Sequence, residues 1–537
     1  MEFLAGLPTV SASILVLIFL LIVFQEAVNG FHDTANAVAT VIYSNAMKAG
    51  PAVALAAFMN FLGVLAGGTA VAFGLVYLLP NEIIAGVNSI DKIALFLALI
   101  VTALGWNFGT WWLGMPNSTT HTYIGSIIGV GIAHAFVKGQ PIIEAINWHQ
   151  GQKILITLAV SPLVGFLLGF ALLKLVALFV KDPEMYRPAH HHKRHPDWDK
   201  WGQDPPSTEV AGAPSPEVAA AVGALARSPE RIERPARLPG AAASGPADDG
   251  SQPETRPPAA IRAALVAGSA GVAFLHGSND GQKSIGLMML VLFALAPLSY
   301  GLNSSRLNEA DIQKAAITLQ QVEQIATQSA SDPVIGKGAQ KVLDETRNLL
   351  TLVSTRECAD PRNQQSAACA KMREGLLVLH QTISRGLKQG ENAGKFTPQQ
   401  VAQLTDARKV LGSFIEYVPF WVILLSALAL GLGTAFGYEK IVTTLGEKMG
   451  SAHMNPAQGT AAQASAIVGI GLANFGGMPV STTHVLSAAV LGSVVGTRGE
   501  KVNMHTVGKI AITWFTTLPG TVIVSFILSV IFYLALV

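Results

Sequence analysis

Long apolar runs constrain this sequence more than any other feature. Residues 13–24, 54–79, 93–104, 154–180 and 523–537 form runs that reach or approach the roughly 20 residues that cross a bilayer as a helix. Backbone N–H and C=O groups find no water in lipid, so only helices and closed barrels can span it. With half of its residues hydrophobic and only 13% charged, the chain is predicted to be an all-α, polytopic protein of the lipid bilayer.

The apolar segments fall into two groups of five. They lie at 8–42, 51–79, 93–113, 118–137 and 153–180, and then at 261–299, 416–437, 460–475, 481–497 and 506–536. An odd number of segments in each half turns the second half over relative to the first, which predicts two inverted repeats. We therefore divide the chain into a first membrane repeat (1–181), a linker (182–260), the start of the second repeat (261–299), an insert (300–414) and the rest of the second repeat (415–537).

The linker is rich in Pro, Ala, Ser, Glu and Arg and poor in large apolar residues, so it is predicted to be disordered. Basic residues such as Lys174, Lys181 and Arg262 at its borders favour the cytoplasmic side. Its histidines at 190–192 are interpreted as part of a solvated basic patch rather than as a metal site.

The insert has apolar residues at helical spacing, for example Ile312, Leu319 and Leu376, and is predicted to be a soluble helical bundle. Lying one membrane crossing away from a cytoplasmic linker, it is expected on the periplasmic side. Its Cys358 and Cys369 are the two cysteines of the chain, and they either form a disulfide or remain free thiols. The insert could act as a lid, a partner surface or a spacer.

Two related polar stretches interrupt the apolar segments. They are Gly-Phe-His-Asp-Thr-Ala-Asn-Ala at 30–37 and Gly-Ser-Asn-Asp-Gly-Gln-Lys-Ser at 277–284. The alignment pairs Asp33 with Asp280 and Asn36 with Lys283. Helical spacing puts the two polar groups of each stretch, Asp33 with Asn36 and Asp280 with Lys283, on one face of their helix. A carboxylate at mid-bilayer costs about 2.5 to 3.5 kcal/mol, so both aspartates are predicted to face a cavity, a partner or a bound cation. The alternative is a hydrated helix end near the membrane surface.

A second motif is also duplicated. Met-Pro-Asn-Ser-Thr-Thr-His at 115–121 returns as Met-Pro-Val-Ser-Thr-Thr-His at 478–484. Proline before the hydroxyl residues predicts a broken helix whose new N-terminus is capped by Ser118 or Ser481. Such an N-terminus presents free N–H groups and a positive dipole end, which suit an oxyanion. These segments either cross the membrane or re-enter it, and His121 and His484 either shuttle protons or hydrogen-bond the backbone.

These motifs resemble those of the inorganic phosphate transporter family, the Pit permeases. The resemblance covers both membrane repeats and is greatest to the bacterial low-affinity, proton-coupled branch. It implies a secondary active transporter of the bacterial inner membrane that imports inorganic phosphate with protons by alternating access. The phosphate would travel either alone or as a neutral complex with a divalent metal ion.

The resemblance also assigns roles to residues. The substrate-binding residues would be Asp33, Asn36, Ser118, Thr119, Thr120, Asp280, Lys283, Ser481, Thr482 and Thr483. Proton or cation coupling would involve Asp33, Asp280, His32 and Asn279, and the two aspartates are the candidates for a metal. Sodium-coupled relatives tend to repeat Asn-Asp-x-Ala-Asn in both halves, whereas here Lys283 stands in the second copy where the first has Asn36. This favours proton coupling. His32 in place of the more usual asparagine before Asp33 points the same way.

Other classes of function fit the sequence less well. A sodium-coupled phosphate carrier or a sulfate carrier would use the same helix termini, and a membrane receptor or channel could use the insert for sensing. We expect no enzyme and no cofactor, because the sequence shows neither a nucleophile with a positioned base nor a phosphate-binding loop. A net charge of +2 gives no reason to expect a nucleic acid partner, and the Gly-rich repeats are compatible with a monomer or a homodimer.

Overall fold

A computed structural model describes residues 9–84, 90–187, 257–332, 336–355, 357–360, 366–392, 394–437, 439–450 and 454–536. Across these ranges the regular secondary structure is helical, apart from an isolated bridge between Gly450 and Val502. Among these described residues, seven helices are long and apolar enough to cross a membrane, judged by length and composition. The prediction of an all-α, polytopic membrane protein is confirmed. Nearly all of the linker, including its histidines, lies outside the described residues.

The helices of the first repeat follow the predicted apolar segments. They are α1 (Thr9–Tyr43), α2 (Ala49–Ala66), α3 (Ala70–Val76), α4 (Asn81–Ile84), α5 (Ile90–Trp112), α6 (Thr119–Val137) and α7 (Trp148–Phe179). The segment predicted at 51–79 is divided between α2 and α3, because Gly67 and Gly68 are poor helix formers and follow the last residue of α2. A Cβ on Gly67 would lie 3.1 Å from the Ser278 carbonyl oxygen, so glycine also lets the chain pass close to α9 (Ala259–Leu295).

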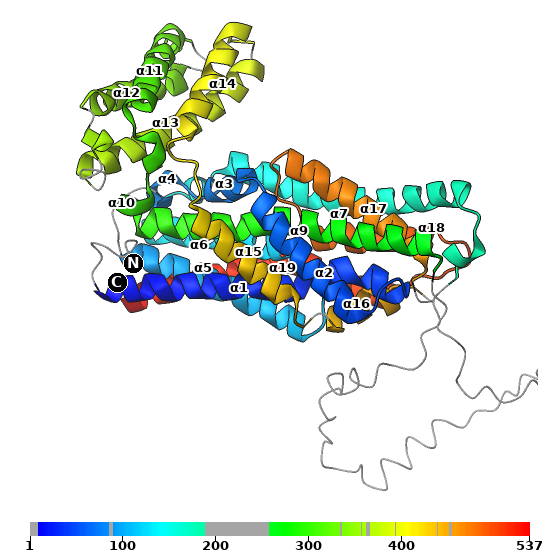
Figure 1. Cartoon of the computed structure of the whole chain (residues 1–537). Coiled ribbons are helices and arrows are strands. Elements are labelled where there is room, and N and C mark those ends of the chain that lie inside the picture. Colours follow the sequence, from blue (N-terminus) through cyan, green and yellow to red (C-terminus); the bar gives the residue numbers. More distant parts are fainter. Residues whose placement is uncertain are drawn as a thin grey trace, which may run out of the picture. The chain divides into compact units, whose positions relative to one another are not determined.

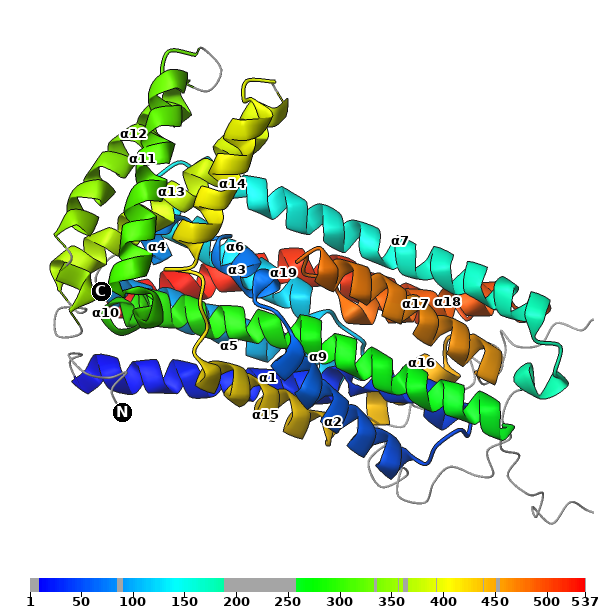
Figure 2. The same ribbon diagram turned by 45° about the horizontal axis from the view of Figure 1, so that its top comes forward.

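The second repeat begins with α9 and the short α10 (Pro297–Tyr300) and resumes after the insert. Its later helices are α15 (Phe420–Thr434), α16 (Glu439–Glu447), α17 (Pro456–Phe475), α18 (Thr482–Gly496) and α19 (Met504–Leu536). Helices α1 and α9 carry the two related polar stretches and contact each other. They run in opposite directions, because α1 starts at the end of the bundle where α9 finishes and α10 follows (Figures 1 and 2). This is the direction that inverted repeats require, and the full repeat symmetry remains a prediction.

Helices from the two repeats pack in reciprocal pairs. Helix α2 packs on α9 while α15 packs on α1, and α6 packs on α19 while α18 packs on α7. Glycine permits these close contacts: a Cβ on Gly129 of α6 would lie 2.4 Å from the Val522 carbonyl oxygen, and a Cβ on Gly492 of α18 would lie 2.2 Å from that of Phe166. The last helix of each repeat therefore packs against the Ser-Thr-Thr-His helix of the other repeat.

The Ser-Thr-Thr-His helices begin deep in the bundle. Helices α5 and α6 form one hairpin and α17 and α18 a second. Thr119 at the start of α6 donates a hydrogen bond to Asp280, which is near the middle of α9, and Thr483 at the start of α18 donates one to Asp33 within α1. The tips of both hairpins thus lie beside the interior of the longest helices rather than beside their ends. Whether these segments cross the membrane or re-enter it stays a prediction.

The insert is built from α11 (Glu309–Ser329), α12 (Gly336–Ser354), α13 (Ala367–Asn392) and α14 (Pro398–Gly412). The apolar positions that the helical spacing selects are buried, Ile312, Leu319 and Leu376 among them. Cys358 and Cys369 are joined in a disulfide, which ties the chain ahead of α13 to the first turn of that helix. The oxidised state of this pair in the cell is a proposal.

The base of the insert and the segment that follows it contact the first repeat. Arg373 of α13 donates a hydrogen bond to the carbonyl of Ile84 (3.2 Å), and the Tyr77 hydroxyl donates one to Glu416 Oε1 (2.8 Å). His380 Nε2 lies 3.5 Å from the same carboxylate oxygen. Burial lowers the pKa of His380 below its ordinary value of 6.5 despite the attraction of Glu416.

Candidate functional site

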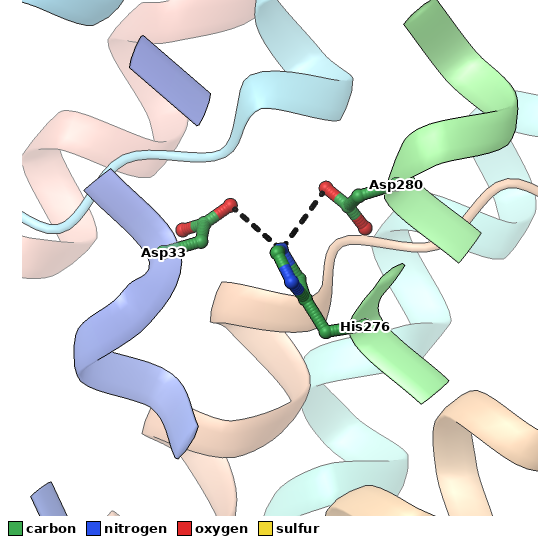
Figure 3. Close-up of side chains that lie close together, drawn as sticks. All are labelled: Asp33, His276 and Asp280. Atoms are coloured by element: carbon green, nitrogen blue, oxygen red, sulfur yellow. Dashed lines mark ion pairs between the residues drawn. The ribbon is translucent and has the colours of Figure 1, made fainter. Parts of the chain in front are cut away.

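Helices α1 and α9 bring two buried carboxylates and a histidine together. The Nε2 atom of His276 lies 3.5 Å from Asp33 Oδ2 and 3.7 Å from Asp280 Oδ2, so the imidazole ring stands between the two acids (Figure 3). Glycines at the start of both polar stretches allow neighbouring helices to approach. A Cβ on Gly30 would lie 2.5 Å from the Leu430 carbonyl oxygen, and a Cβ on Gly277 would lie 2.2 Å from that of Asn60.

Asp33 is held by hydroxyl and amide donors. Its Oδ1 atom accepts hydrogen bonds from Thr483 Oγ1 (2.6 Å) and Asn36 Nδ2 (3.2 Å). The same amide lies 3.2 Å from Thr483 Oγ1, and His32 Nδ1 is 3.3 Å from Asp33 Oδ1. Asp33, Asn36 and Thr483 therefore link α1 to the start of α18.

Asp280 is held differently, because a lysine stands where the first repeat has Asn36. Lys283 is fully buried, and its Nζ donates to Thr120 Oγ1 (2.6 Å), Asp280 Oδ1 (2.7 Å) and the Val480 carbonyl (2.8 Å). All three ammonium hydrogens can thus be used. Thr119 Oγ1 donates to the other oxygen of Asp280 (3.2 Å).

The two hairpins present matching helix N-termini to these acids. The Ser118 side chain accepts from the backbone N–H of His121, and the Ser481 side chain accepts from that of His484, as expected for N-caps. The first amides of each helix have no intrahelical acceptor, and the helix dipole adds positive potential there. Both tips also touch, since Thr120 Oγ1 donates to the Val480 carbonyl (2.9 Å).

Every residue that the sequence predicts for the site is buried, and ten of the twelve lie among these contacts. The exceptions are Thr482, whose Oγ1 has no hydrogen-bond partner among the described residues, and Asn279. The Asn279 amide donates to Asn474 Oδ1 and accepts weakly from the Val480 N–H, so it positions the tip of the α17 and α18 hairpin. The predicted role of Asn279 in cation coupling remains a proposal.

Several buried polar atoms of the site have no hydrogen-bond partner in the part of the chain that the structure describes. They include Asp33 Oδ2, Asn36 Oδ1, Thr482 Oγ1 and His276 Nε2, of which Asp33 Oδ2 and His276 Nε2 face each other at 3.5 Å. Buried polar atoms are normally satisfied, so a cluster of exceptions marks a place for a ligand. This cluster offers acceptors and one hydroxyl beside the N-terminus of α18.

Asp33, His276 and Asp280 form a set that could hold a metal ion, because one ligand atom from each lies within 4.8 Å of the others. His276 Nδ1 is 2.9 Å from Asn60 Oδ1. When Nδ1 carries the proton and donates it to this oxygen, Nε2 is left with a free lone pair that faces the carboxylates. Metal-binding histidines are commonly oriented in this way by an acceptor on the second nitrogen. Imidazole and carboxylates together suit divalent ions such as Zn²⁺, Mn²⁺ or Co²⁺.

Sequence reasoning missed two members of this site. His276 shares a helical face with Asp280 and Lys283, at i, i+4 and i+7, but the motif comparison gives it no role, and it does not select Asn60. Asn60 is an amide inside the apolar segment at 51–79, which was the signal available. The two histidines of the Ser-Thr-Thr-His motifs were noticed, and their rings meet at 4.5 Å between centroids, with His121 Nδ1 2.8 Å from Ser118 Oγ.

Comparisons with known proteins agree on one family. The model of the phosphate transporter family matches residues 29–525. The low-affinity inorganic phosphate transporters PitA and PitB of Escherichia coli (strain K12) are 34% and 33% identical to the chain, each over 97% of both sequences. A probable low-affinity inorganic phosphate transporter of Bacillus subtilis (strain 168) is 24% identical over 97% of this chain and 99% of its own.

A solved structure, the sodium-dependent phosphate transporter, aligns with 97% of this chain and 99% of its own length, with 19% identity and a TM-score of 0.47. The family match covers both repeats and includes the polar stretches and the Ser-Thr-Thr-His motifs described above. The chain belongs to the phosphate transporter family.

Proposed function

We propose that this protein imports inorganic phosphate across the bacterial inner membrane by proton symport, with alternating access to a single site. The observation that carries the proposal is the meeting of two capped helix N-termini, one from each repeat, beside two buried carboxylates. N-terminal amides and hydroxyls suit an oxyanion, and the acids provide sites for the cations that must accompany it. The names of the E. coli relatives support phosphate as the substrate.

Phosphate would bind between the two hairpin tips. The hydroxyls and amides of Ser118, Thr119 and Thr120 on one side, and of residues 481–483 on the other, would donate to its oxygens. Lys283 lies at the junction of the tips and would add a fixed positive charge. Its three present acceptors compete with phosphate for the ammonium, so binding would rearrange this contact.

The carboxylates require a cation when the anion is present. Phosphate near Asp33 and Asp280 would be repelled strongly in a site without bulk water. Protons on the acids, or a divalent ion held by the acids and His276, would remove that repulsion. A metal ion arriving with phosphate would be part of the cargo, and the loaded site would cross with little net charge.

Reconstituted protein allows a direct test. Labelled phosphate uptake into liposomes would be measured under an inward proton gradient, with and without a divalent metal ion, and under a sodium gradient. We expect proton-driven uptake that rises with metal. The variants D33N and D280N should lose it, and D344N should retain it because Asp344 is exposed on α12.

The same experiment separates the alternatives. Uptake driven by sodium alone would keep the phosphate site and refute proton coupling. Competition by excess sulfate against labelled phosphate would favour a sulfate carrier. A channel would equilibrate phosphate but never concentrate it, and a receptor would show no uptake under any gradient.

A further inference from the structure

Glu26 is a buried carboxyl that the proposed phosphate site does not use. It lies at the middle of α1, seven residues before Asp33, and its side chain is fully buried. Two helical turns, about 10 Å, separate it from Asp33 along the helix axis. Its hydrogen-bond partners are Ser284 of α9, Ser426 of α15 and Asn29 of α1. None of these three belongs to the set that could hold a metal ion.

The surroundings of Glu26 lack a direct cationic partner. Its hydrogen-bond partners among the described residues are two hydroxyls and an amide, all neutral. The titratable groups that face it are Asp280 and His276 on α9 and Tyr123 on α6. A carboxylate buried without a paired cation is expensive, whereas a neutral acid in the same place needs only hydrogen bonds.

The hydrogen-bond network can satisfy Glu26 in either protonation state. With Glu26 ionised, Ser284 and Ser426 donate to its two oxygens, and the Tyr123 hydroxyl, 3.2 Å from Ser284 Oγ, donates to Ser284. With Glu26 protonated, the acid donates to Ser284, and Ser284 donates on to Tyr123.

Ser426 also has a second acceptor. Its hydroxyl is 3.3 Å from the Gly281 carbonyl and equally 3.3 Å from Glu26 Oε1, so it can turn away when the acid is protonated. A carboxyl that served only to brace the helices would need no such second arrangement.

We propose that Glu26 binds a proton that is co-transported with phosphate, at a position separate from the phosphate and metal site. This inference rests on the proposed proton symport. A proton from water on the uptake side adds to the Glu26 carboxylate and forms the O–H bond of the acid. After the conformational change, that bond breaks, the proton passes to water on the other side, and the carboxylate is restored. Because the side chain is fully buried here, each exchange requires the protein to open.

Two assays on the same proteoliposomes test this role. One measures phosphate accumulation driven by a proton gradient, and the other measures exchange of labelled for unlabelled phosphate at equal pH on both sides. E26Q mimics the protonated acid and cannot release a proton. It should lose gradient-driven accumulation and keep exchange, because exchange moves the loaded carrier back and forth without deprotonation.

Matched variants make the result specific. E26D keeps a titratable group and should recover part of the accumulation. E144Q removes the same charge from an exposed position and should behave as wild type in both assays. Infrared difference spectra between acid and alkaline pH should show the carbonyl band of a protonated carboxylic acid, shifted in E26D and missing in E26Q.

Three outcomes would overturn the proposal. They are gradient-driven accumulation by E26Q equal to wild type, loss of exchange together with accumulation in both E26Q and E26D, and an infrared band unchanged by E26Q. Failure of the proposed function looks different, because wild-type protein would then itself show no proton-driven accumulation.

Discussion

Replacement of Lys283 by methionine removes a fully buried cation while keeping a side chain of similar length. In the wild-type protein the ammonium joins three helices, through Asp280 on α9, Thr120 on α6 and the Val480 carbonyl ahead of α18. Without it, Asp280 keeps, among the described residues, the hydrogen bond from the Thr119 hydroxyl and the longer 3.7 Å contact with His276 Nε2. Breaking a buried ion pair by removing one partner costs about 3 to 5 kcal/mol, and we expect K283M to be destabilised by this amount.

A second substitution distinguishes charge from packing. In D280N/K283M the uncompensated carboxylate is gone, and the remaining loss is that of hydrogen bonds to Thr120 and Val480, about 0.5 to 1.5 kcal/mol each. The double variant should therefore be more stable than K283M. Reversible unfolding in mixed micelles, followed by circular dichroism, gives the free energies for the complete double-mutant cycle.

The control is K337M, which removes an exposed lysine from α12 and should leave stability within about 0.5 kcal/mol of wild type. The reasoning fails if K283M is as stable as this control. It also fails if D280N/K283M is less stable than K283M, because the carboxylate would then not be the group that Lys283 compensates.

Three further predictions concern packing, the disulfide and pH. A Cβ on Gly492 would lie 2.2 Å from the Phe166 carbonyl oxygen, so G492A should cost about 1 to 3 kcal/mol in the same unfolding assay, whereas G508A meets nothing within 4 Å and should be neutral. The disulfide joins two cysteines 11 residues apart, so C358S should lower the stability of the insert by about 3 kcal/mol. Reduction of the wild-type protein should cause the same loss, measured for both by limited proteolysis. Burial favours the neutral form of His380, so its contribution to insert stability is present above pH 6.5 and is lost as the pH falls below 6.5. H380Q should make the proteolysis rate of the insert depend less on pH, and an unchanged pH dependence would refute this prediction.

The sequence predicts much of the membrane architecture because hydrophobic length and duplicated motifs are local signals. Helix boundaries such as those of α6 and α18 follow directly from serine caps and proline. Both aspartates were predicted to need partners because a carboxylate is costly in a bilayer.

The pairing of side chains across distant helices was not predictable in the same way. The equivalent motifs suggest equal roles for their hydroxyls, yet Asp280 takes the first threonine of one motif and Asp33 the second threonine of the other. Lys283 is the physical reason, because it occupies Thr120 and leaves Thr119 to Asp280. Likewise, Asn60 orients His276 across 216 residues of sequence, a contact set by helix rotation and depth rather than by spacing.

The reciprocal packing of α6 on α19 and of α18 on α7 bears on how such a chain could have evolved. In each of these pairs, a helix of one half packs against the helix of the other half, and exchanging the two halves gives the other pair. Two identical chains related by a twofold axis make contacts of this kind. Under the predicted inverted repeat, a half-length ancestor would have been a homodimer, inserted in two orientations, with exchanged last helices. Fusion would have kept those contacts and let each copy diverge, as Asn36 and Lys283 have. Segments 1–187 and 257–537, produced as separate chains, should therefore reassemble when co-expressed, while either alone leaves its Ser-Thr-Thr-His helix uncovered.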